Sequence, residues 1–147
     1  MVTCIPIDSK TDFDKWSELW KGYLHFYETT LPLEQYHNTF SRLVDEQGDL
    51  FGFILEDDDG VPIGLAHYLY HVSAWSSKPQ CYLNDLFVDP ARRGTGGGRL
   101  LIEAVKRQAD SRGCSRLYWL TAPDNAAARK LYDKVATTNR VAYKIDL

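Results

Sequence analysis

The spacing of apolar residues in the first third of the chain predicts a strand followed by two helices. Residues 2–7 can form the opening strand. Between residues 13 and 27, aromatic and leucine side chains recur at steps of three and four, which is the period of one helical face. Pro32 interrupts this pattern, and residues 33–44 repeat it as a second helix. The aromatic stripe on the first helix is expected to lie in the core.

The remaining pattern predicts a hairpin and then two strand–helix units. Residues 50–55 and 63–72 are apolar or alternating, and Asp59-Gly60 between them is a hairpin signal, because glycine tolerates the positive φ of the turn. The later elements expected are a strand over 82–88, a helix from the glycines at 96–98 to Arg112, a strand over 116–121, a helix over 126–135 and a final strand over 140–145. This order predicts a mixed α/β sheet with helices on both faces.

Length and composition indicate one globular domain over residues 1–147, with 44% hydrophobic and 25% charged residues. The three cysteines are widely separated and odd in number, so we expect small hydrophobic side chains in a reducing cytoplasm. No apolar run reaches the length of a membrane span, and a net charge of −3 disfavours general affinity for nucleic acid. His67 and His71 lack further metal ligands, and we interpret them as packing or surface residues.

The stretch from Tyr82 to Arg99 combines a strand, a turn and a glycine-rich helix start. The apolar run ends at Asp89-Pro90, two arginines follow, and four of the five residues from Gly94 to Gly98 are glycine. Glycine costs about 1 kcal/mol against alanine inside a helix, so close approach of a ligand to the backbone is the plainest reason for this run. Unpaired N–H groups and the helix dipole favour an anion there. We interpret the segment as a pyrophosphate site; the alternative is a tight turn with a solvated basic edge.

The spacing of the glycines excludes two common nucleotide motifs. A P-loop needs G-x-x-x-x-G-K-[ST] and a Rossmann fingerprint needs G-x-G-x-x-G, and neither occurs. The chain instead has R-x-x-G-x-G, formed by Arg93, Gly96 and Gly98 after LFVDP, and later an N-x-x-A-x-x-x-Y motif that ends at Tyr132. Together these motifs resemble the GNAT superfamily of acyl-CoA-dependent N-acetyltransferases over about residues 52–135. Within it, YLNDLFV is most similar to the branch of histone, polyamine and D-amino-acid acetyltransferases.

This resemblance implies a fold, a co-substrate and an assembly. The fold would be a GNAT-type mixed, mostly antiparallel sheet, splayed between the central strand and the next strand to admit pantetheine. The co-substrate would be acetyl-CoA, with no metal. The family's usual assembly is a homodimer, and the short tail implies that a partner subunit completes part of the acceptor wall. The CoA-binding residues implied are Phe87, Val88, Arg93, Gly94, Thr95, Gly96, Gly97, Gly98, Arg99 and Asn125.

In the reaction that the resemblance implies, an amine attacks the thioester carbonyl, an oxyanion forms and the CoA thiolate leaves. Preorganised N–H groups at the end of the central strand suit the oxyanion. Tyr132 matches the family's tyrosine that protonates the thiolate, and a phenol with a pKa near 10 stays protonated at neutral pH. Without the resemblance, Tyr132 would be interpreted as a core aromatic residue.

The base that deprotonates the amine is left open by the sequence. An aliphatic ammonium has a pKa of about 10.4, so a base or a water chain must remove one proton. Spermidine/spermine acetyltransferases have Glu in YLED where this chain has Asn84, and an amide cannot act as that base. Asp85 interrupts an apolar run and either faces a cleft, as a catalytic residue, or caps neighbouring loops. Glu28 or Glu34, acting through water, are the other candidates.

The acceptor side is also assigned by resemblance. In such acetyltransferases the first helices and their connection form one wall of the acceptor site, which implicates Tyr27, Glu28, Glu34 and Tyr36, with Asn84 from the central strand. A solvated face is the alternative for both glutamates. Polyamine, amino acid, antibiotic amine and protein lysine all remain open as acceptors.

Two other functions stay as alternatives. A non-catalytic acyl-CoA sensor would keep residues 94–99 but would not need Tyr132. A nucleic-acid-binding protein would use the arginine cluster and show steep salt dependence, although the acidic overall charge argues against it.

Overall fold

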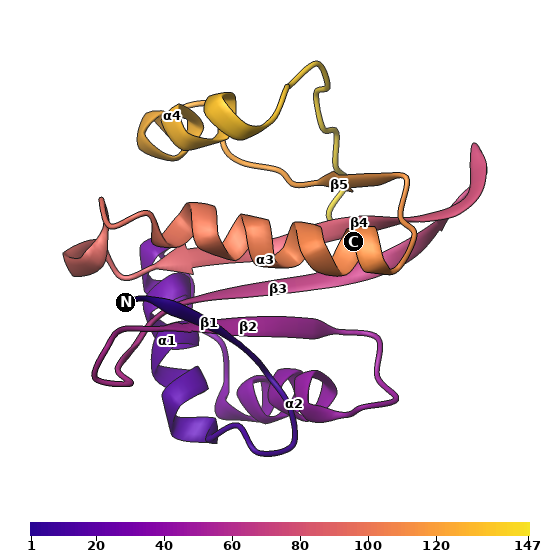
Figure 1. The fold of residues 1–147 in the computed structure, drawn as a ribbon. Helices are drawn as coiled ribbons and strands as arrows, with labels where there is room; N and C mark the ends of the chain where they lie inside the picture. The colour runs from indigo at the N-terminus through magenta and orange to yellow at the C-terminus, as the bar shows by residue number, and fades with distance from the viewer.

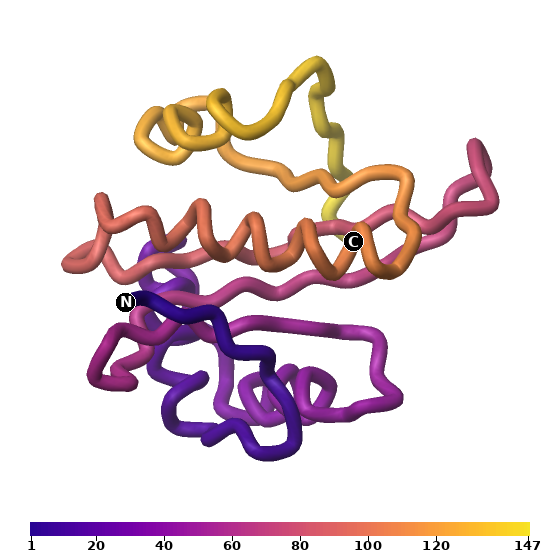
Figure 2. The backbone as a smooth tube through the Cα atoms, in the orientation of Figure 1, coloured from indigo at the N-terminus to yellow at the C-terminus, as the bar shows by residue number.

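The computed structural model describes residues 1–147 and contains one five-stranded sheet with helices on both faces (Figures 1 and 2). None of its helices is long and apolar enough to cross a membrane. In chain order the elements are β1 (Thr3–Pro6), α1 (Phe13–Phe26), α2 (Leu33–Val44), β2 (Phe51–Glu56), β3 (Pro62–Ser73), β4 (Ser76–Val88), the 3-10 turn η1 (Pro90–Arg92), α3 (Gly97–Ser111), β5 (Arg116–Tyr118) and α4 (Ala126–Val135).

The sheet is antiparallel except at one edge. Its strands follow the order β1-β2-β3-β4-β5, and only the pair of β4 and β5 is parallel. The β4–β5 pairing is short, because it joins only Gln80–Tyr82 to Arg116–Tyr118. Beyond Tyr82, the edge of β4 that faces away from β3 has no strand partner. The predicted mixed, mostly antiparallel sheet with an opening after the central strand is therefore confirmed (Figure 1).

Each face of the sheet carries its own hydrophobic core. On one face α3 buries Leu101, Ala104 and Val105 against β2, β3 and β4. On the other face α1 buries Trp16 and Trp20, and α2 packs beside them. These residues recur at helical spacing in the sequence, so the predicted aromatic stripe does lie in the core. Figure 1 shows α3 crossing in front of the long strands, with α1 and α2 on the other side.

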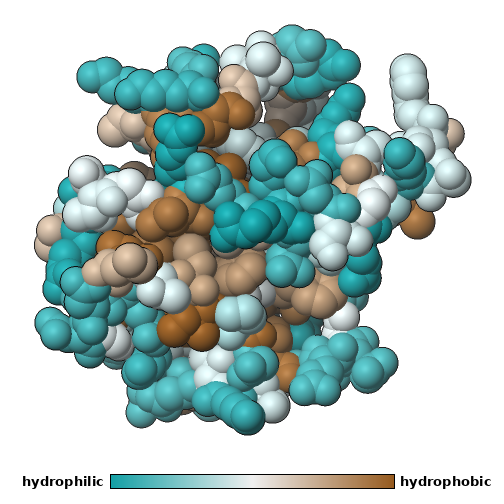
Figure 3. Space-filling model, in the orientation of Figure 1, coloured by the Kyte–Doolittle hydropathy of each residue, from teal (hydrophilic) through white to brown (hydrophobic).

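Helix α4 stands apart from both cores. None of its residues is fully buried, and Figure 1 shows it raised above β5. Leu131, Tyr132 and Val135 nevertheless pack against the edge of the α3 core. Figure 3 shows hydrophobic surface along the side of α4 that faces the rest of the molecule. The space between α3, α4 and the free edge of β4 is thus bordered by apolar side chains.

The final strand expected over residues 140–145 is absent, and that prediction was wrong. The segment after α4 has no strand structure. Its apolar side chains are solvent-exposed, at 79% for Val141, 95% for Tyr143 and 85% for Ile145. Alternation of apolar and polar residues gives a strand only where a neighbouring strand supplies hydrogen bonds, and within one chain the three-residue β5 does not pair with this segment.

We predict that Gly64→Ala lowers the free energy of unfolding by about 1–3 kcal/mol. A Cβ at Gly64 would lie 2.7 Å from the carbonyl oxygen of Phe87, so the backbones of β3 and β4 would have to separate. Urea unfolding followed by circular dichroism measures the change. Ser77→Ala, on an exposed part of β4, is the matched control and should shift stability by less than about 0.5 kcal/mol. Equal stabilities of the two variants would contradict this close packing.

Candidate active site

The glycines at residues 94–98 have two distinct structural roles. Gly94 and Gly96 have φ values of +85° and +81°, and no atom lies within 4 Å of the position that a Cβ would occupy. They shape the loop in a conformation that other residues rarely adopt. At Gly97 and Gly98 a Cβ would lie 2.7 Å from Leu55 and 3.1 Å from Leu131, respectively. These two glycines therefore allow α3 to lie close to β2 and to α4. The sequence had suggested a different reason for glycine here, namely the close approach of a ligand to the backbone.

The start of α3 presents unpaired backbone donors. Gly96 is the N-cap and provides no side-chain cap, and the helical hydrogen bonds begin with Leu100 N–H donating to Gly96 O at 3.1 Å. The N–H groups of Gly97, Gly98 and Arg99 precede that bond and lie at the positive end of the helix dipole. Thr95 stabilises the preceding turn, since its hydroxyl donates to Arg92 O at 2.9 Å. This loop and helix start fit an anionic phosphate group.

The three arginines around this loop differ in their partners. Arg92 is paired with Asp57 at 2.9 Å, and Arg99 is paired with Glu103 at 3.2 Å. Arg93 has no carboxylate partner. Its Nε donates to the Val88 carbonyl at 3.2 Å, and its guanidinium lies 5.1 Å from the centroid of the Phe26 ring. Arg93 is therefore the arginine of this cluster whose charge is not already neutralised.

An extra residue in β4 reverses the direction of the side chains that follow it. His67 pairs with Asp85 and Tyr68 pairs with Leu83, so Asn84 is the unmatched residue of a β-bulge. Before the bulge, Leu83 belongs to the α3 core; after it, Phe87 belongs to the α1 core. Without the extra residue, strict alternation would place Asp85 and Phe87 on the α3 face instead. The bulge thus directs Asp85 toward α1.

The backbone of β4 also alternates between β3 and the open edge. The Asp89 N–H donates to Ile63 O at 2.8 Å, and the Phe87 carbonyl faces Gly64, so both of these residues point toward β3. The intervening Val88, and Leu86 before it, then direct their N–H groups to the unpaired edge. Phe87 and Val88 were predicted to bind the acetyl and pantetheine portions. The backbone groups of Phe87 point toward β3, whereas those of Val88 and Leu86 point toward the open edge. Which residues point toward the open edge depends on the bulge, and the sequence carries no clear signal for the bulge.

Asp85 is the carboxylate at the centre of a hydrogen-bond cluster. Its Oδ2 lies 3.0 Å from His67 Nδ1 and 2.8 Å from Asn84 Nδ2, and it also accepts from the Tyr23 hydroxyl. Its side chain is 11% exposed. Burial alone would raise the pKa of Asp85, but the hydrogen bonds from these three donors, together with the positive charge of His67 when it is protonated, hold it below the ordinary value. Burial and the Asp85 charge, in turn, raise the pKa of Tyr23 well above its usual range.

Sequence analysis did not find His67 and Tyr23 as parts of this cluster. His67 is 1% exposed, and it is hydrogen-bonded rather than merely packed or on the surface. It is 18 residues from Asp85 in the chain, and Tyr23 comes from another element. The one signal in the sequence for such a cluster is Asp85 itself, because a carboxylate within a buried strand needs hydrogen-bond donors around it.

Tyr132 lies on α4 near the open edge. Its ring makes an edge-to-face contact with Trp119, with centroids 5.4 Å apart. Burial raises the pKa of Tyr132, the neighbouring Tyr27 adds to this effect, and the charge of Arg93 opposes it. The hydroxyl therefore stays protonated at neutral pH, as an acid requires. Asn125 occupies the N-cap position of α4, and its side chain donates to the Thr121 hydroxyl at 3.3 Å rather than capping the helix.

Of the residues predicted for the acceptor side, only some lie together. Tyr27 is 49% exposed and packs on Tyr23, with centroids 4.9 Å apart, while Asn84 contacts Asp85. Glu28 is exposed directly after Tyr27, with a φ of +52°. Glu34 is exposed in the first turn of α2, and no hydrogen bond or ion pair joins it to the others. The structure thus brings Tyr27, Asn84, Asp85 and Tyr132 to one region, and it leaves Glu34 outside.

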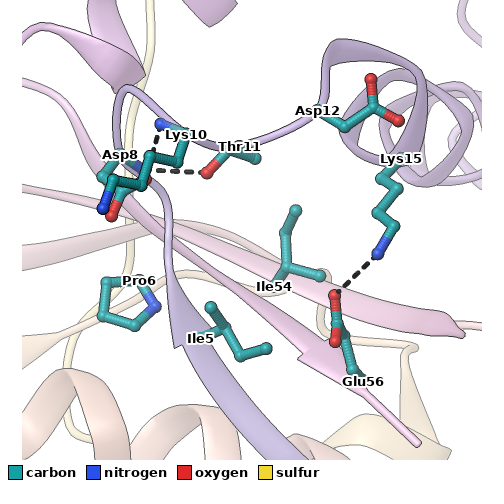
Figure 4. Close-up of a pocket in the computed structure, with 9 residues that line it drawn as sticks. All are labelled: Ile5, Pro6, Asp8, Lys10, Thr11, Asp12, Lys15, Ile54 and Glu56. Carbon is teal, nitrogen blue, oxygen red and sulfur yellow. Dashed lines mark hydrogen bonds and ion pairs between the residues drawn. The ribbon is translucent and has the colours of Figure 1, made fainter. Parts of the chain in front are cut away.

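A depression at the other edge of the sheet contains none of these groups. The depression in Figure 4 lies at the β1 edge of the sheet, beside the loop that leads into α1. Its lining includes the ion pair between Lys15 and Glu56, at 3.4 Å. It is open to solvent, and most of the residues that line it are polar or charged. The convergence of chemistry at the β4 opening therefore defines the candidate active site, and this depression does not.

Comparisons with known proteins identify the family of the chain. The model of the Acetyltransferase (GNAT) family matches residues 13–136. A D-amino-acid N-acetyltransferase of Saccharomyces cerevisiae is 42% identical over 135 residues, covering 90% of this chain and 84% of the relative. An aminoglycoside N(6′)-acetyltransferase type 1 of Salmonella typhimurium is 27% identical, covering 92% of each chain.

A solved structure also matches the whole chain. It is AAC(6′)-Iy in complex with the bisubstrate analogue CoA-S-monomethyl-acetylneamine, with a TM-score of 0.84 and 25% identity, covering 100% of this chain and 99% of that one. The family match, the 42% identical relative and this fold agree with the family indicated by the two motifs. The chain therefore belongs to the GNAT family of acetyltransferases and is an acyl-CoA-dependent N-acetyltransferase.

Proposed function

We propose that this enzyme transfers the acetyl group of acetyl-CoA directly to the primary amine of a small molecule, with an amino acid as the leading acceptor class. The observation that carries the acceptor class is the 42% identity, over most of both chains, to a D-amino-acid N-acetyltransferase. Direct transfer in a ternary complex is supported by the placement of anion-binding donors and the Asp85 carboxylate near the same strand, β4. Polyamines, aminoglycosides and protein lysines are the other amines to be tested.

The opening between β4 and α4 accounts for the binding of the CoA portion. The free N–H groups of residues 97–99 and the guanidinium of Arg93 would hold the pyrophosphate. The unpaired N–H groups of Leu86 and Val88 would hydrogen-bond the pantetheine amide and the acetyl carbonyl, as a neighbouring strand otherwise would. A donor fixed in the sheet needs no reorganisation when the oxyanion forms, so it stabilises that oxyanion efficiently.

The chemical step needs one acid and one acceptor of protons. The amine nitrogen forms a bond to the carbonyl carbon, the carbon–sulfur bond breaks, and Tyr132 donates its proton to the departing thiolate. The proton lost by the amine leaves through water next to Asp85. Because hydrogen bonds hold the pKa of Asp85 below its ordinary value, this carboxylate stays ionised and attracts the ammonium form of the acceptor. Glu28 is the remaining candidate for a base at the same end of α1.

We predict that Tyr132→Phe lowers kcat by about 10²- to 10⁴-fold, because the leaving thiolate loses its proton donor, while CoA binding is retained. The assay is CoA-thiol release with D- and L-amino acids, spermidine, spermine, aminoglycosides and a lysine-rich peptide. Trp75→Phe, at a side chain that is 96% exposed on the turn between β3 and β4, is the control. Unchanged turnover in Tyr132→Phe would refute the catalytic role. Tight CoA binding by the wild type without any turnover would instead favour a sensor.

We predict that Arg93→Ala weakens CoA binding about tenfold or more, because one charge-assisted contact to phosphate is lost. Isothermal titration calorimetry with CoA measures the dissociation constant. Lys106→Ala is the control, since Lys106 lies on the exposed side of α3 and is paired with Asp110. If both variants bind CoA as the wild type does, the arginine is not part of the site.

We also propose that the enzyme is a homodimer. The support is the segment after α4, whose alternating apolar side chains are exposed in a single chain and could add to the sheet of a second copy. The double substitution Tyr143→Asp and Ile145→Asp is then expected to shift a dimer to a monomer in sedimentation velocity. Lys144→Ala, between these two positions, should leave the dimer intact. A monomeric wild type would overturn this proposal.

A further inference from the structure

We infer that His67 is a positioning residue that Trp16 holds in one neutral tautomer, and that in this form it directs the Asp85 carboxylate toward the acceptor amine. The inference deepens the proposed function and rests on it for the identity of the acceptor site. It is carried by a continuous set of hydrogen bonds from Trp16 through His67 to Asp85, which joins α1, β3 and β4.

The direction of these hydrogen bonds follows from the indole of Trp16. Indole N–H can only donate, and Trp16 Nε1 lies 3.0 Å from His67 Nε2. His67 Nε2 must therefore be the acceptor, without a proton. In a neutral imidazole the proton is then on Nδ1, which lies 3.0 Å from Asp85 Oδ2 and donates to it. One donor on α1 thus determines the tautomer of a histidine on β3.

Burial prevents water from replacing either partner. Trp16 and His67 are 0% and 1% exposed, and the Trp20 ring lies 5.1 Å from the imidazole, centroid to centroid. Protonation of Nε2 would leave two N–H groups facing each other with no acceptor for the indole. A buried donor without a partner costs about 1–3 kcal/mol, so Trp16 opposes protonation of Nε2, while the ionised Asp85 favours it. In its neutral form His67 is a fixed donor to Asp85 and does not relay protons.

The same bonds leave room for one more donor on Asp85. A carboxylate has about four lone-pair sites, and His67, Asn84 and Tyr23 account for three of them. The remaining site, on a side chain that is 11% exposed, is the position for an N–H of the acceptor amine. The ionisable groups facing Asp85 are His67 from β3, Tyr23 from α1 and Tyr82 from β4. None of them is a cation while His67 stays neutral, so the acceptor ammonium meets an unneutralised carboxylate.

The direct test is nitrogen NMR of the histidine side chains in the full-length protein, without any substrate. We expect wild-type His67 to show a protonated Nδ1 and a bare Nε2 at pH 7. Trp16→Phe keeps an aromatic ring but removes the indole donor, so the proton of His67 should then no longer be confined to Nδ1. Trp20→Phe is the matched control, because its Nε1 is buried without a hydrogen-bond partner. A wild-type His67 that carries a proton on Nε2 overturns the inference.

Kinetics test the consequence for the acceptor. In Trp16→Phe, kcat/KM for the amine should fall about tenfold, because His67 is no longer held in the tautomer that donates to Asp85, and the KM for acetyl-CoA should not change. His67→Leu should lower kcat/KM for the amine by about 10- to 100-fold. His67→Gln, which retains one donor and one acceptor, should recover most of it. Equal loss in the Leu and Gln variants, or equal changes for both substrates, would show a structural role only and refute positioning.

The two tests separate failure of this inference from failure of the proposed function. The NMR result requires no acceptor, so it stands even if no amine in the panel is acetylated. If an amine is acetylated while wild-type His67 carries a proton on Nε2, the proposed function holds and the inference fails.

Discussion

The unmatched residue Asn84 in β4 determines how the rest of the site can be built. A one-residue insertion in a strand exchanges the two faces for every residue that follows. Here it moves Asp85 from the α3 face to the α1 face, where His67 and Tyr23 supply donors. A carboxylate on the α3 face would meet Leu101 and Val105 in a dry core and would lack these partners. The bulge therefore makes a charged residue tolerable in the central strand.

The short β4–β5 pairing has a cost that the ligand can offset. Beyond Tyr82 the free edge of β4 carries backbone groups that would normally bond a neighbouring strand. Leu86 and Val88 are half-buried at this edge, so their N–H groups need either water or a ligand. An extended chain of amides such as pantetheine can take the place of the missing strand. The same feature that leaves the sheet incomplete thus gives the enzyme its substrate-binding edge.

The motifs could be predicted from the sequence because their physics is local. R-x-x-G-x-G predicts unpaired N–H groups at a helix start, and the structure has α3 beginning there. What the sequence could not resolve depends on contacts between distant segments. Gly97 is explained by Leu55, 42 positions away, and Asp85 by His67, 18 positions away. The strand predicted over residues 140–145 is absent for the same reason. Alternation of apolar and polar residues is a local pattern, whereas a strand needs a neighbouring strand to pair with.

The remaining unpaired charges match the two substrates in sign. Most charged side chains near the opening are already neutralised, since Arg92 pairs with Asp57 and Arg99 with Glu103. Arg93, which follows η1, has no carboxylate partner, and Asp85, three residues before Val88, has no cationic partner while His67 is neutral. A cation therefore remains where the anionic CoA binds, and an anion remains where an ammonium approaches. If His67 were charged, Asp85 would lose that function, so the indole of Trp16 preserves the electrostatic asymmetry on which recognition of an amine depends.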